Sequence, residues 1–115
     1  MIARLRQHAS FVLLALLSLP AAFPFLGGNL PRTNDIATHV FRAFELEQLL
    51  RAGVLLPRWG PQLVHGYGYP IFNYFPYLPH YFITLTHMAS GVDYLWAYRL
   101  VAVGVTFVAG WGAYL

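Results

Sequence analysis

The chain has 115 residues, of which 58% are hydrophobic and only 10% are charged. Soluble domains carry about 25% charged residues, so this composition favours a lipid environment. The formal net charge is +3, and all seven positive charges are scattered arginines, which excludes the dense basic patch of a nucleic-acid-binding protein. There is no cysteine, so neither disulfides nor thiolate metal sites can form.

The first apolar run covers about residues 9–26 and follows Arg4 and Arg6. A positive segment before an apolar stretch fits either a membrane anchor or a secretory signal. The run approaches the minimum length for crossing a bilayer, and a small-residue cleavage site would have to include Pro20. We therefore expect a first transmembrane helix over about 9–26, with its N-terminus in the cytoplasm because of the two arginines.

The polar segment over about 27–74 holds most of the charges and is expected to be a large extracytoplasmic loop. Thr33 or Asn34 is a suitable helix N-cap and Gly53 a suitable stop, so we expect a helix over about 35–52. Its apolar positions are Ile36, Val40, Phe41, Phe44, Leu46, Leu49 and Leu50, and its polar positions are Thr38, His39, Arg42, Glu45, Glu47 and Arg51. This alternation predicts an amphipathic helix that lies along the membrane interface.

Residues 57–79 contain five prolines and three glycines, a spacing that no regular helix or strand tolerates. Six aromatic residues between Tyr67 and Tyr77 give the segment much apolar surface. We expect an ordered aromatic loop that folds back on the membrane surface. Its rings either stack on a sugar or isoprenoid or form an interfacial aromatic belt.

Two further apolar runs predict transmembrane helices over about 75–91 and 94–115, separated by a short turn at Val92-Asp93. The expected fold is an all-α membrane protein of the inner (plasma) membrane. It has three transmembrane helices and a large first extracytoplasmic loop that bears an interfacial amphipathic helix. Because the last run has no polar flank, we expect the chain to be the N-terminal part of a longer protein with a single membrane domain.

Asp35, His39 and Arg42 are spaced i, i+4 and i+7, so they share one face of the predicted helix. A carboxylate, an imidazole and a guanidinium on one strip could serve as general base, second base or metal ligand, and phosphate clamp. Alternatively, Asp35 only complements the helix dipole and the other two side chains are solvated. We take Asp35 as the candidate catalytic residue, with His39 and Arg42 as substrate-binding residues.

Other polar residues have two interpretations each. Arg58, between a proline and a tryptophan, either binds a lipid-linked phosphate or anchors the chain among headgroups. His80, Thr84 and His87 form one polar stripe, which either faces a wet cavity or makes hydrogen bonds between helices. Arg58 and His80 are further candidate substrate-binding residues, and Arg99 is expected to snorkel to the cytoplasmic interface.

The sequence lacks the H-E-x-x-H pattern, a glycine-rich phosphate loop and a supported Ser–His–Asp or Cys–His arrangement. Glu45 and Glu47 fall on different faces of the predicted helix, so they do not form a paired acid site. We therefore predict no metal-ligand set and no firm cofactor, and the use of a divalent metal is left open.

Three stretches form the most specific pattern in the chain: D-x-x-x-H-x-x-R over 35–42, G-V-L-L-P-R-W over 53–59, and G-Y-G-Y-P-I-F-N-Y-F-P-Y-L over 66–78. Together they resemble the N-terminal part of polytopic membrane glycosyltransferases of the GT-C type. The closest group is that of the bacterial "6-pyruvoyl-tetrahydropterin synthase-related" membrane proteins, a label that implies no pterin chemistry here. The resemblance covers about residues 10–115.

The resemblance implies a helical bundle whose first extracytoplasmic loop carries an acidic residue, acting as base or metal-binding group, and a polyprenyl-phosphate sugar as donor. Asp35 matches this acid, whereas Arg58 and His80 have no firm counterpart. The expected function is transfer of a sugar from the lipid-linked donor to an extracytoplasmic acceptor, with the 115-residue piece inactive by itself. The expected partners are the donor and membrane lipids. The alternatives are a non-catalytic small membrane subunit and a transporter or flippase fragment.

Overall fold

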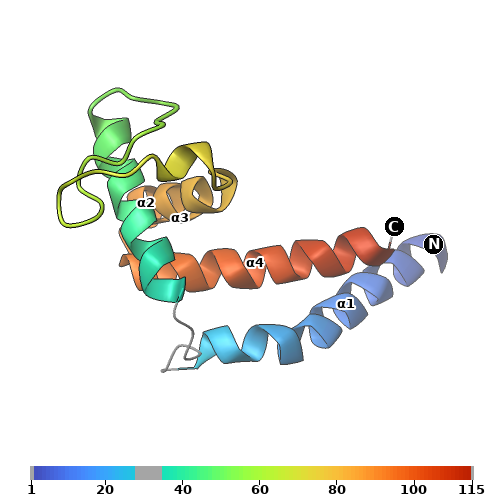
Figure 1. Cartoon of the computed structure of the whole chain (residues 1–115). Helices are drawn as coiled ribbons and strands as arrows, with labels where there is room; N and C mark the ends of the chain where they lie inside the picture. Colours follow the sequence, from blue (N-terminus) through green and yellow to red (C-terminus); the bar gives the residue numbers. More distant parts are fainter. Residues whose placement is uncertain (1, 28–34, 115) are drawn as a thin grey trace. The chain divides into compact units, whose positions relative to one another are not determined.

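The computed structural model describes residues 2–27 and 35–114, with side chains from residue 8 onward, and its regular elements are helices (Figure 1). In chain order they are α1 (Ile2–Leu26), α2 (Asp35–Arg51), the 3₁₀ helix η1 (Ile71–Asn73), α3 (Leu78–Ser90) and α4 (Tyr94–Tyr114). The chain divides into two compact units. One is Thr33–Val101, and the other combines Met1–Arg32 with Ala102–Leu115, so α4 contributes to both.

In the unit that combines Met1–Arg32 with Ala102–Leu115, α1 and the last part of α4 lie side by side and run in opposite directions (Figure 1). The Tyr114 hydroxyl donates a hydrogen bond to Ser10 Oγ at 2.8 Å. Further along, Gly110 lies so close to Ser18 that an added Cβ would be 3.1 Å from the Ser18 hydroxyl. Residue numbers rise along α1 as they fall along α4, so the two helices are antiparallel.

Two helices within the described residues are long and apolar enough to cross a membrane, namely His8–Leu26 of α1 and Tyr94–Tyr114, which is the whole of α4. Only 6% and 11% of their apolar windows are buried within the protein, so neither is the enclosed core helix of a soluble fold. The all-helical fold agrees with the sequence, and these helices match the predicted spans over 9–26 and 94–115. This pattern favours a membrane protein.

The predicted second span, over 75–91, is not among these helices. In its place α3 has 13 residues, which extend about 20 Å and fall short of the roughly 30 Å hydrocarbon core. The predicted end is confirmed, because Gly91 adopts a positive φ of 72° and caps the helix. Helix α3 begins at Leu78 and not near residue 75 as predicted, since Pro79 fits only the first turn of a helix. The described residues therefore contain two helices of spanning length and not the three expected.

The ends of α2 agree closely with the sequence, since the helix covers Asp35–Arg51 and stops one residue before its predicted end. Gly53 adopts a φ of 85°, and the next N–H donates to the Leu49 carbonyl at 2.9 Å. This left-handed residue and its 6→1 bond are the Schellman stop of a helix. The predicted N-caps Thr33 and Asn34 lie outside the described residues.

Three polar contacts at successive turns join α2 to α3. They pair His39 with His80, Ala43 with Thr84, and Glu47 with His87. Residue numbers rise together along both helices, so α2 and α3 are parallel neighbours. The predicted polar stripe on α3 therefore makes hydrogen bonds between helices, which was one of its two interpretations.

The apolar core of the Thr33–Val101 unit consists of two clusters. Their buried members are Ala43, Ile83 and Ala97 in one and Leu46, Ile71 and Phe72 in the other. The first cluster joins α2 to α3 and the start of α4, and the second joins α2 to η1. Helix α2 is therefore covered from two directions.

This packing corrects the predicted pattern of an amphipathic α2. Glu45 and Glu47, expected on the polar face, are buried, whereas Phe41 and Phe44, expected on the apolar face, are exposed. The burial is tolerated because each carboxylate has hydrogen-bond donors.

Arg99 also departs from its predicted position. It is buried within the protein, and its guanidinium carbon lies 4.7 Å from the centre of the Trp96 ring. A cation over an indole face is favourable in surroundings from which water is excluded. Arg99 is therefore held by packing on α4 and does not extend away from the protein.

Candidate functional site

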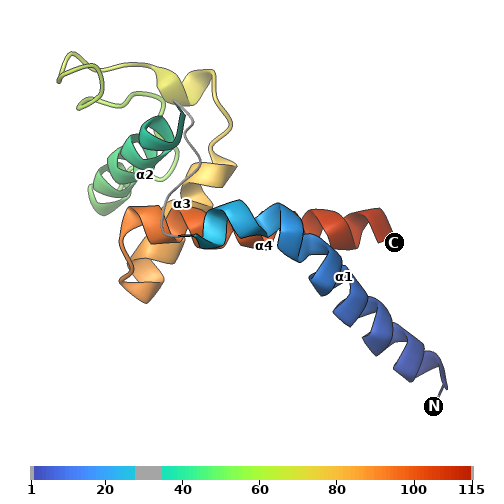
Figure 2. The same ribbon diagram turned by 90° about the horizontal axis from the view of Figure 1, so that it is seen from below.

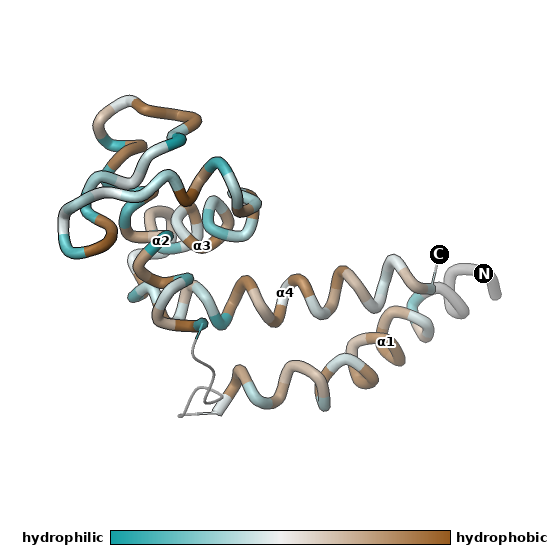
Figure 3. Tube along the Cα trace, in the orientation of Figure 1, coloured by the Kyte–Doolittle hydropathy of each residue, from teal (hydrophilic) through white to brown (hydrophobic). Residues whose placement is uncertain are grey.

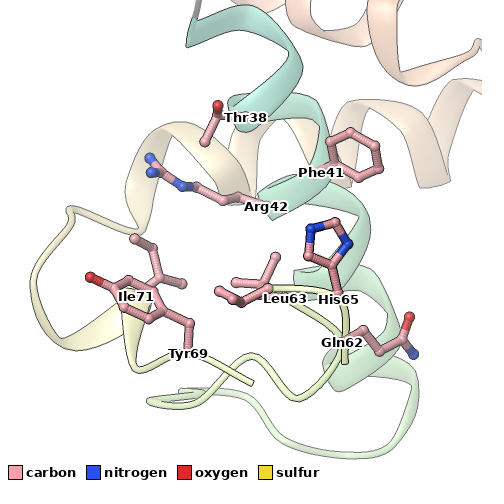
Figure 4. Close-up of a pocket in the computed structure, with 9 residues that line it drawn as sticks. Thr38, Phe41, Arg42, Gln62, Leu63, His65, Tyr69 and Ile71 are labelled. Carbon is pink, nitrogen blue, oxygen red and sulfur yellow. The ribbon is translucent and has the colours of Figure 1, made fainter. Parts of the chain in front are cut away.

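A pocket of about 510 Å³ lies between α2 and the loop that follows it (Figure 4). Three of its lining residues, Thr38, Phe41 and Arg42, come from α2, and the loop faces them with Leu63, His65 and Tyr69. The combination of a guanidinium, an imidazole, hydroxyls and apolar walls is typical of a small-molecule site. Of these six, the sequence had named Arg42 as a candidate substrate-binding residue and had included Tyr69 among the rings of the aromatic loop.

The loop that forms one wall of the pocket is closed by an antiparallel bridge. The N–H of Gly60 donates to the Tyr69 carbonyl at 2.9 Å, and the Tyr69 N–H donates back at 3.0 Å. The loop is further held to α2 because Glu45 Oε1 accepts the Gln62 N–H at 2.9 Å. The predicted ordered loop without regular helix or strand is thus confirmed, apart from the single turn of η1.

The backbone of this loop is strained where it meets the pocket. Val64 and His65 have φ values of 55° and 56°, a left-handed conformation that is rare for any non-glycine residue and especially for a β-branched one. Each such residue costs about 1–3 kcal/mol and is found most often at functional sites. The bridge between Gly60 and Tyr69 imposes this turn, which places His65 at the pocket.

A tight contact between Trp59 and Gly68 supports the same loop. A Cβ added at Gly68, whose φ is 78°, would lie 2.5 Å from Trp59 Nε1. The indole therefore occupies the space that any other side chain would need. Only glycine combines this close approach with the positive φ.

Arg42 supplies the positive charge of the pocket. Its guanidinium carbon lies 4.3 Å from the centre of the Phe75 ring, which holds the group by a cation–π contact. Burial lowers the pKa of Arg42 and the charge of Asp35 raises it, and a guanidinium remains protonated under such conditions. Arg42 is therefore suited to binding a phosphate or carboxylate.

Asp35 is the first residue of α2 and is exposed. It precedes Thr38 by one helical turn and Arg42 by two, so it lies on the side of α2 that borders the pocket. Burial and the charge of Arg42 lower the pKa of His39, whereas the charge of Asp35 raises it. Asp35 is thus an accessible carboxylate within electrostatic reach of both His39 and Arg42.

The two candidate histidines meet in the structure. His39 Nδ1 lies 3.1 Å from His80 Nε2, and His80 Nδ1 lies 3.3 Å from the Pro76 carbonyl. The carbonyl can only accept, so His80 Nδ1 carries a proton and its Nε2 accepts from His39. Burial and, to a smaller extent, the charge of His39 together lower the pKa of His80 to about 4. His80 is 2% exposed, and through this hydrogen bond it fixes the orientation of the His39 ring.

Arg58 is separate from these residues, since it is exposed and does not line the pocket. Among the described residues, no group of three or more histidine, aspartate and glutamate side chains is arranged to hold a metal ion. The sequence did not single out His65, and no local motif marks it, whereas Tyr69 belongs to the aromatic loop whose rings were expected either to stack on a ligand or to form an interfacial belt. Their role in the pocket depends on the bridge that closes the loop.

A second polar cluster surrounds Glu47, about 18 Å along α2 from Asp35. Arg51 Nε donates to Glu47 Oε1 at 2.7 Å, the Tyr94 hydroxyl donates to Oε2, and His87 Nε2 lies 3.4 Å from Oε2. Burial raises the pKa of Glu47, but the bonds from Tyr94 and Arg51 outweigh it and leave the pKa lowered. This charged carboxylate joins α2, α3 and the start of α4.

The chain is similar to a longer bacterial protein. A protein of Lactococcus lactis subsp. cremoris (strain MG1363), described only as an uncharacterized protein, is 29% identical over 75 residues, which is 65% of this chain. The chain spans 12% of the length of that relative. No protein-family model matches the chain, and no solved structure matches it.

Proposed function

We propose that the chain is the N-terminal part of an integral-membrane glycosyltransferase, which moves a sugar from a polyprenyl-phosphate donor to an extracytoplasmic acceptor. The main support is the pocket that Arg42, His65 and Tyr69 help to line, on the side of α2 that carries the exposed carboxylate of Asp35. An anion-binding guanidinium, an aromatic wall and a nearby base are the groups that such a transfer requires. The resemblance of the three sequence stretches to GT-C enzymes supports the same activity.

In the proposed reaction Asp35 accepts the proton of an acceptor hydroxyl, whose oxygen attacks the anomeric carbon of the donor with inversion. The bond from that carbon to the lipid phosphate breaks, and the phosphate leaves with the bonding electrons. Arg42 stabilises the negative charge that develops on the phosphate. His39, held by His80, is positioned beside both groups as a hydrogen-bonding residue for substrate.

The position of α2 also fits this proposal. Within the Thr33–Val101 unit, α2 runs across the direction of the first part of α4 (Figures 1 and 2). If α4 crosses the bilayer, α2 then lies closer to the membrane plane than to its normal. A site on α2 would meet a donor that diffuses laterally in the same leaflet.

The antiparallel pair of α1 and α4 supports a topology with two spans. We place the N-terminus and the end of α4 in the cytoplasm, and residues 27–93 outside. Asp35 and the whole of α3 are then extracytoplasmic. We propose the inner (plasma) membrane as the location, and Arg4 and Arg6 favour a cytoplasmic N-terminus there.

The transporter alternative has less support. It required the polar stripe of α3 to line a path for a solute. His80 and Thr84 are buried against α2, and the Thr84 hydroxyl donates to the Ala43 carbonyl at 2.8 Å. Their hydrogen-bonding groups are therefore used within the fold.

The variant Asp35→Asn in the full-length protein tests the proposal. Loss of a general base lowers turnover by about 10²–10⁴-fold, measured as transfer of labelled sugar from a polyprenyl phosphate in membranes. Asp93→Asn is the matched control, because Asp93 is also exposed at a helix start and Asn keeps the acceptor for the Trp96 N–H. Near-normal transfer by Asp35→Asn removes Asp35 from the base role. Membranes that transfer no polyprenyl-linked sugar at all favour the non-catalytic subunit.

A further inference from the structure

The loop after α2 presents two leucines to its surroundings. We call residues 53–58 the leucine loop. Leu55 and Leu56 are 71% and 75% exposed, and Figure 3 shows the loop as a brown stretch beyond the end of α2, followed by teal. Adjacent large apolar side chains on a loop tip are unusual unless another surface covers them.

The exposure of these leucines is fixed by the fold. At one end, the 6→1 bond at Gly53 stops α2. In the middle, the Tyr81 hydroxyl of α3 donates to the Leu55 carbonyl. At the other end, Pro57 is among the most deeply buried residues of the chain. The backbone of the loop is therefore pinned to the protein while the side chains of Leu55 and Leu56 point away from it.

The charge around the loop indicates what covers it. Between Glu47 and Asp93 the sequence contains no acidic residue, and its two charged residues are Arg51 and Arg58. Arg51 forms a salt bridge with Glu47, so the exposed Arg58 supplies the local positive charge. Trp59, which follows directly, is half exposed, and tryptophan and arginine both favour the headgroup region of a bilayer.

We propose that the leucine loop inserts Leu55 and Leu56 into the interface of an anionic lipid bilayer, with Arg58 at the headgroup phosphates. The proposal rests on the membrane location proposed above, for which the two apolar helices are the independent support. The backbone of the leucine loop is fixed to the protein, and its two apolar side chains would be buried in the lipid. The loop would therefore hold the Thr33–Val101 unit, which contains the pocket, against the leaflet. The insertion depth is that of an interfacial segment, roughly 5–10 Å.

The absence of cysteine from the chain gives a clean test. Single variants of the full chain are labelled with an environment-sensitive fluorophore in vesicles of phosphatidylcholine and phosphatidylglycerol, with and without doxyl-labelled lipid. Leu56→Cys reports on the loop. Val108→Cys, 67% exposed on α4, is the membrane reference, and Gln62→Cys on the exposed part of the next loop is the polar reference.

We expect doxyl lipid to quench the Leu56→Cys probe at least about twofold more than the Gln62→Cys probe. Adding Arg58→Gln should lower this quenching in anionic vesicles but not in purely zwitterionic ones. An unquenched probe at position 56 beside a quenched probe at Val108→Cys overturns the proposal while the membrane location stands. A probe at position 56 that is shielded but insensitive to doxyl lipid also overturns it, and indicates a protein partner. If the Val108→Cys probe is unquenched, the membrane location itself fails.

Discussion

His39 Nδ1 lies 3.1 Å from His80 Nε2, across 41 residues of sequence. The bond joins the start of α2 to the start of α3 and lies next to the pocket. An N–H···N bond requires one ring nitrogen without a proton, so the pair cannot hold a full complement of protons and keep the contact. This requirement makes the structure sensitive to acid.

We expect the free energy of unfolding to fall as the pH decreases from about 6.5 to about 4. Burial lowers the pKa of His80 from 6.5 to about 4, so in this range the unfolded chain binds a proton that the folded chain excludes. The lowered pKa of His39 acts in the same direction. The loss for His80 is on the order of 3 kcal/mol. Urea unfolding in detergent micelles, followed by circular dichroism at several pH values, measures it.

The variant His80→Gln is the control for this pH dependence. Glutamine does not titrate, so the stability of the variant should change less between pH values of about 6.5 and 4. Identical slopes for the two proteins would show that another group is responsible. Glu47 adds a separate loss at lower pH, because its pKa is lowered from 4.5 and its contribution disappears only as the carboxylate is protonated.

Replacing Glu47 should lower the free energy of unfolding more than replacing its salt-bridge partner Arg51. The Glu47 side chain is 6% exposed and that of Arg51 is 60% exposed. Glu47→Gln leaves the donors of Tyr94, Arg51 and His87 partly unsatisfied, and should cost about 1–3 kcal/mol. Arg51→Ala removes only an exposed partner and should cost less than about 1 kcal/mol. Equal losses in urea unfolding would contradict a role of Glu47 in joining three helices.

Replacement of Gly68 should disturb the pocket loop more than replacement of Gly66. Both have a positive φ, 78° and 87°, but an added Cβ meets the Trp59 ring only at Gly68 and meets nothing within 4 Å at Gly66. Alanine therefore adds backbone strain at both sites and a steric clash at one. In a Trp96→Phe, Trp111→Phe background, Gly68→Ala should shift the emission of Trp59 and Gly66→Ala should not. The same spectrum for both variants would argue against the contact.

The two-span topology predicts which residues are accessible from outside the cell. Asn73→Cys and Ser90→Cys should both react with a membrane-impermeant maleimide in intact cells, because residues 27–93 lie on one side. Ala113→Cys should react only after permeabilisation, since α4 is antiparallel to α1. A topology with three spans would instead place Ser90 in the cytoplasm, so labelling at this residue decides between the two.

Features of the fold that depend on a few neighbouring residues were predicted correctly from the sequence. Gly53 and Gly91 end α2 and α3 as predicted, because the left-handed conformation that stops a helix strongly favours glycine. The apolar runs that became α1 and α4 were equally clear. The run over 75–91 did not form a helix of spanning length, since Pro79 and the polar His80 belong to a short helix, α3, that packs on α2.

Contacts between segments that are distant in the sequence could not be predicted. Nothing local indicates that His39 and His80 meet, or that Glu45 is buried by the backbone of Gln62. Composition also gave no reason to place His65 at a pocket, because its conformation depends on a bridge formed several residues away on either side. The candidate residues on α2 came from helical spacing, and the opposite wall of the pocket required the structure.

The parallel arrangement of α2 and α3 has a geometric consequence for the segment between them. Neighbours that run in the same direction cannot be joined by a tight turn, so the polypeptide must travel back along the whole of α2, about 25 Å, before α3 begins. The long, proline-rich crossover is thus an obligatory return path, and both the leucines and the pocket wall are carried on it. Shortening it to a hairpin would reverse α3 and separate every pair of partners along the two helices.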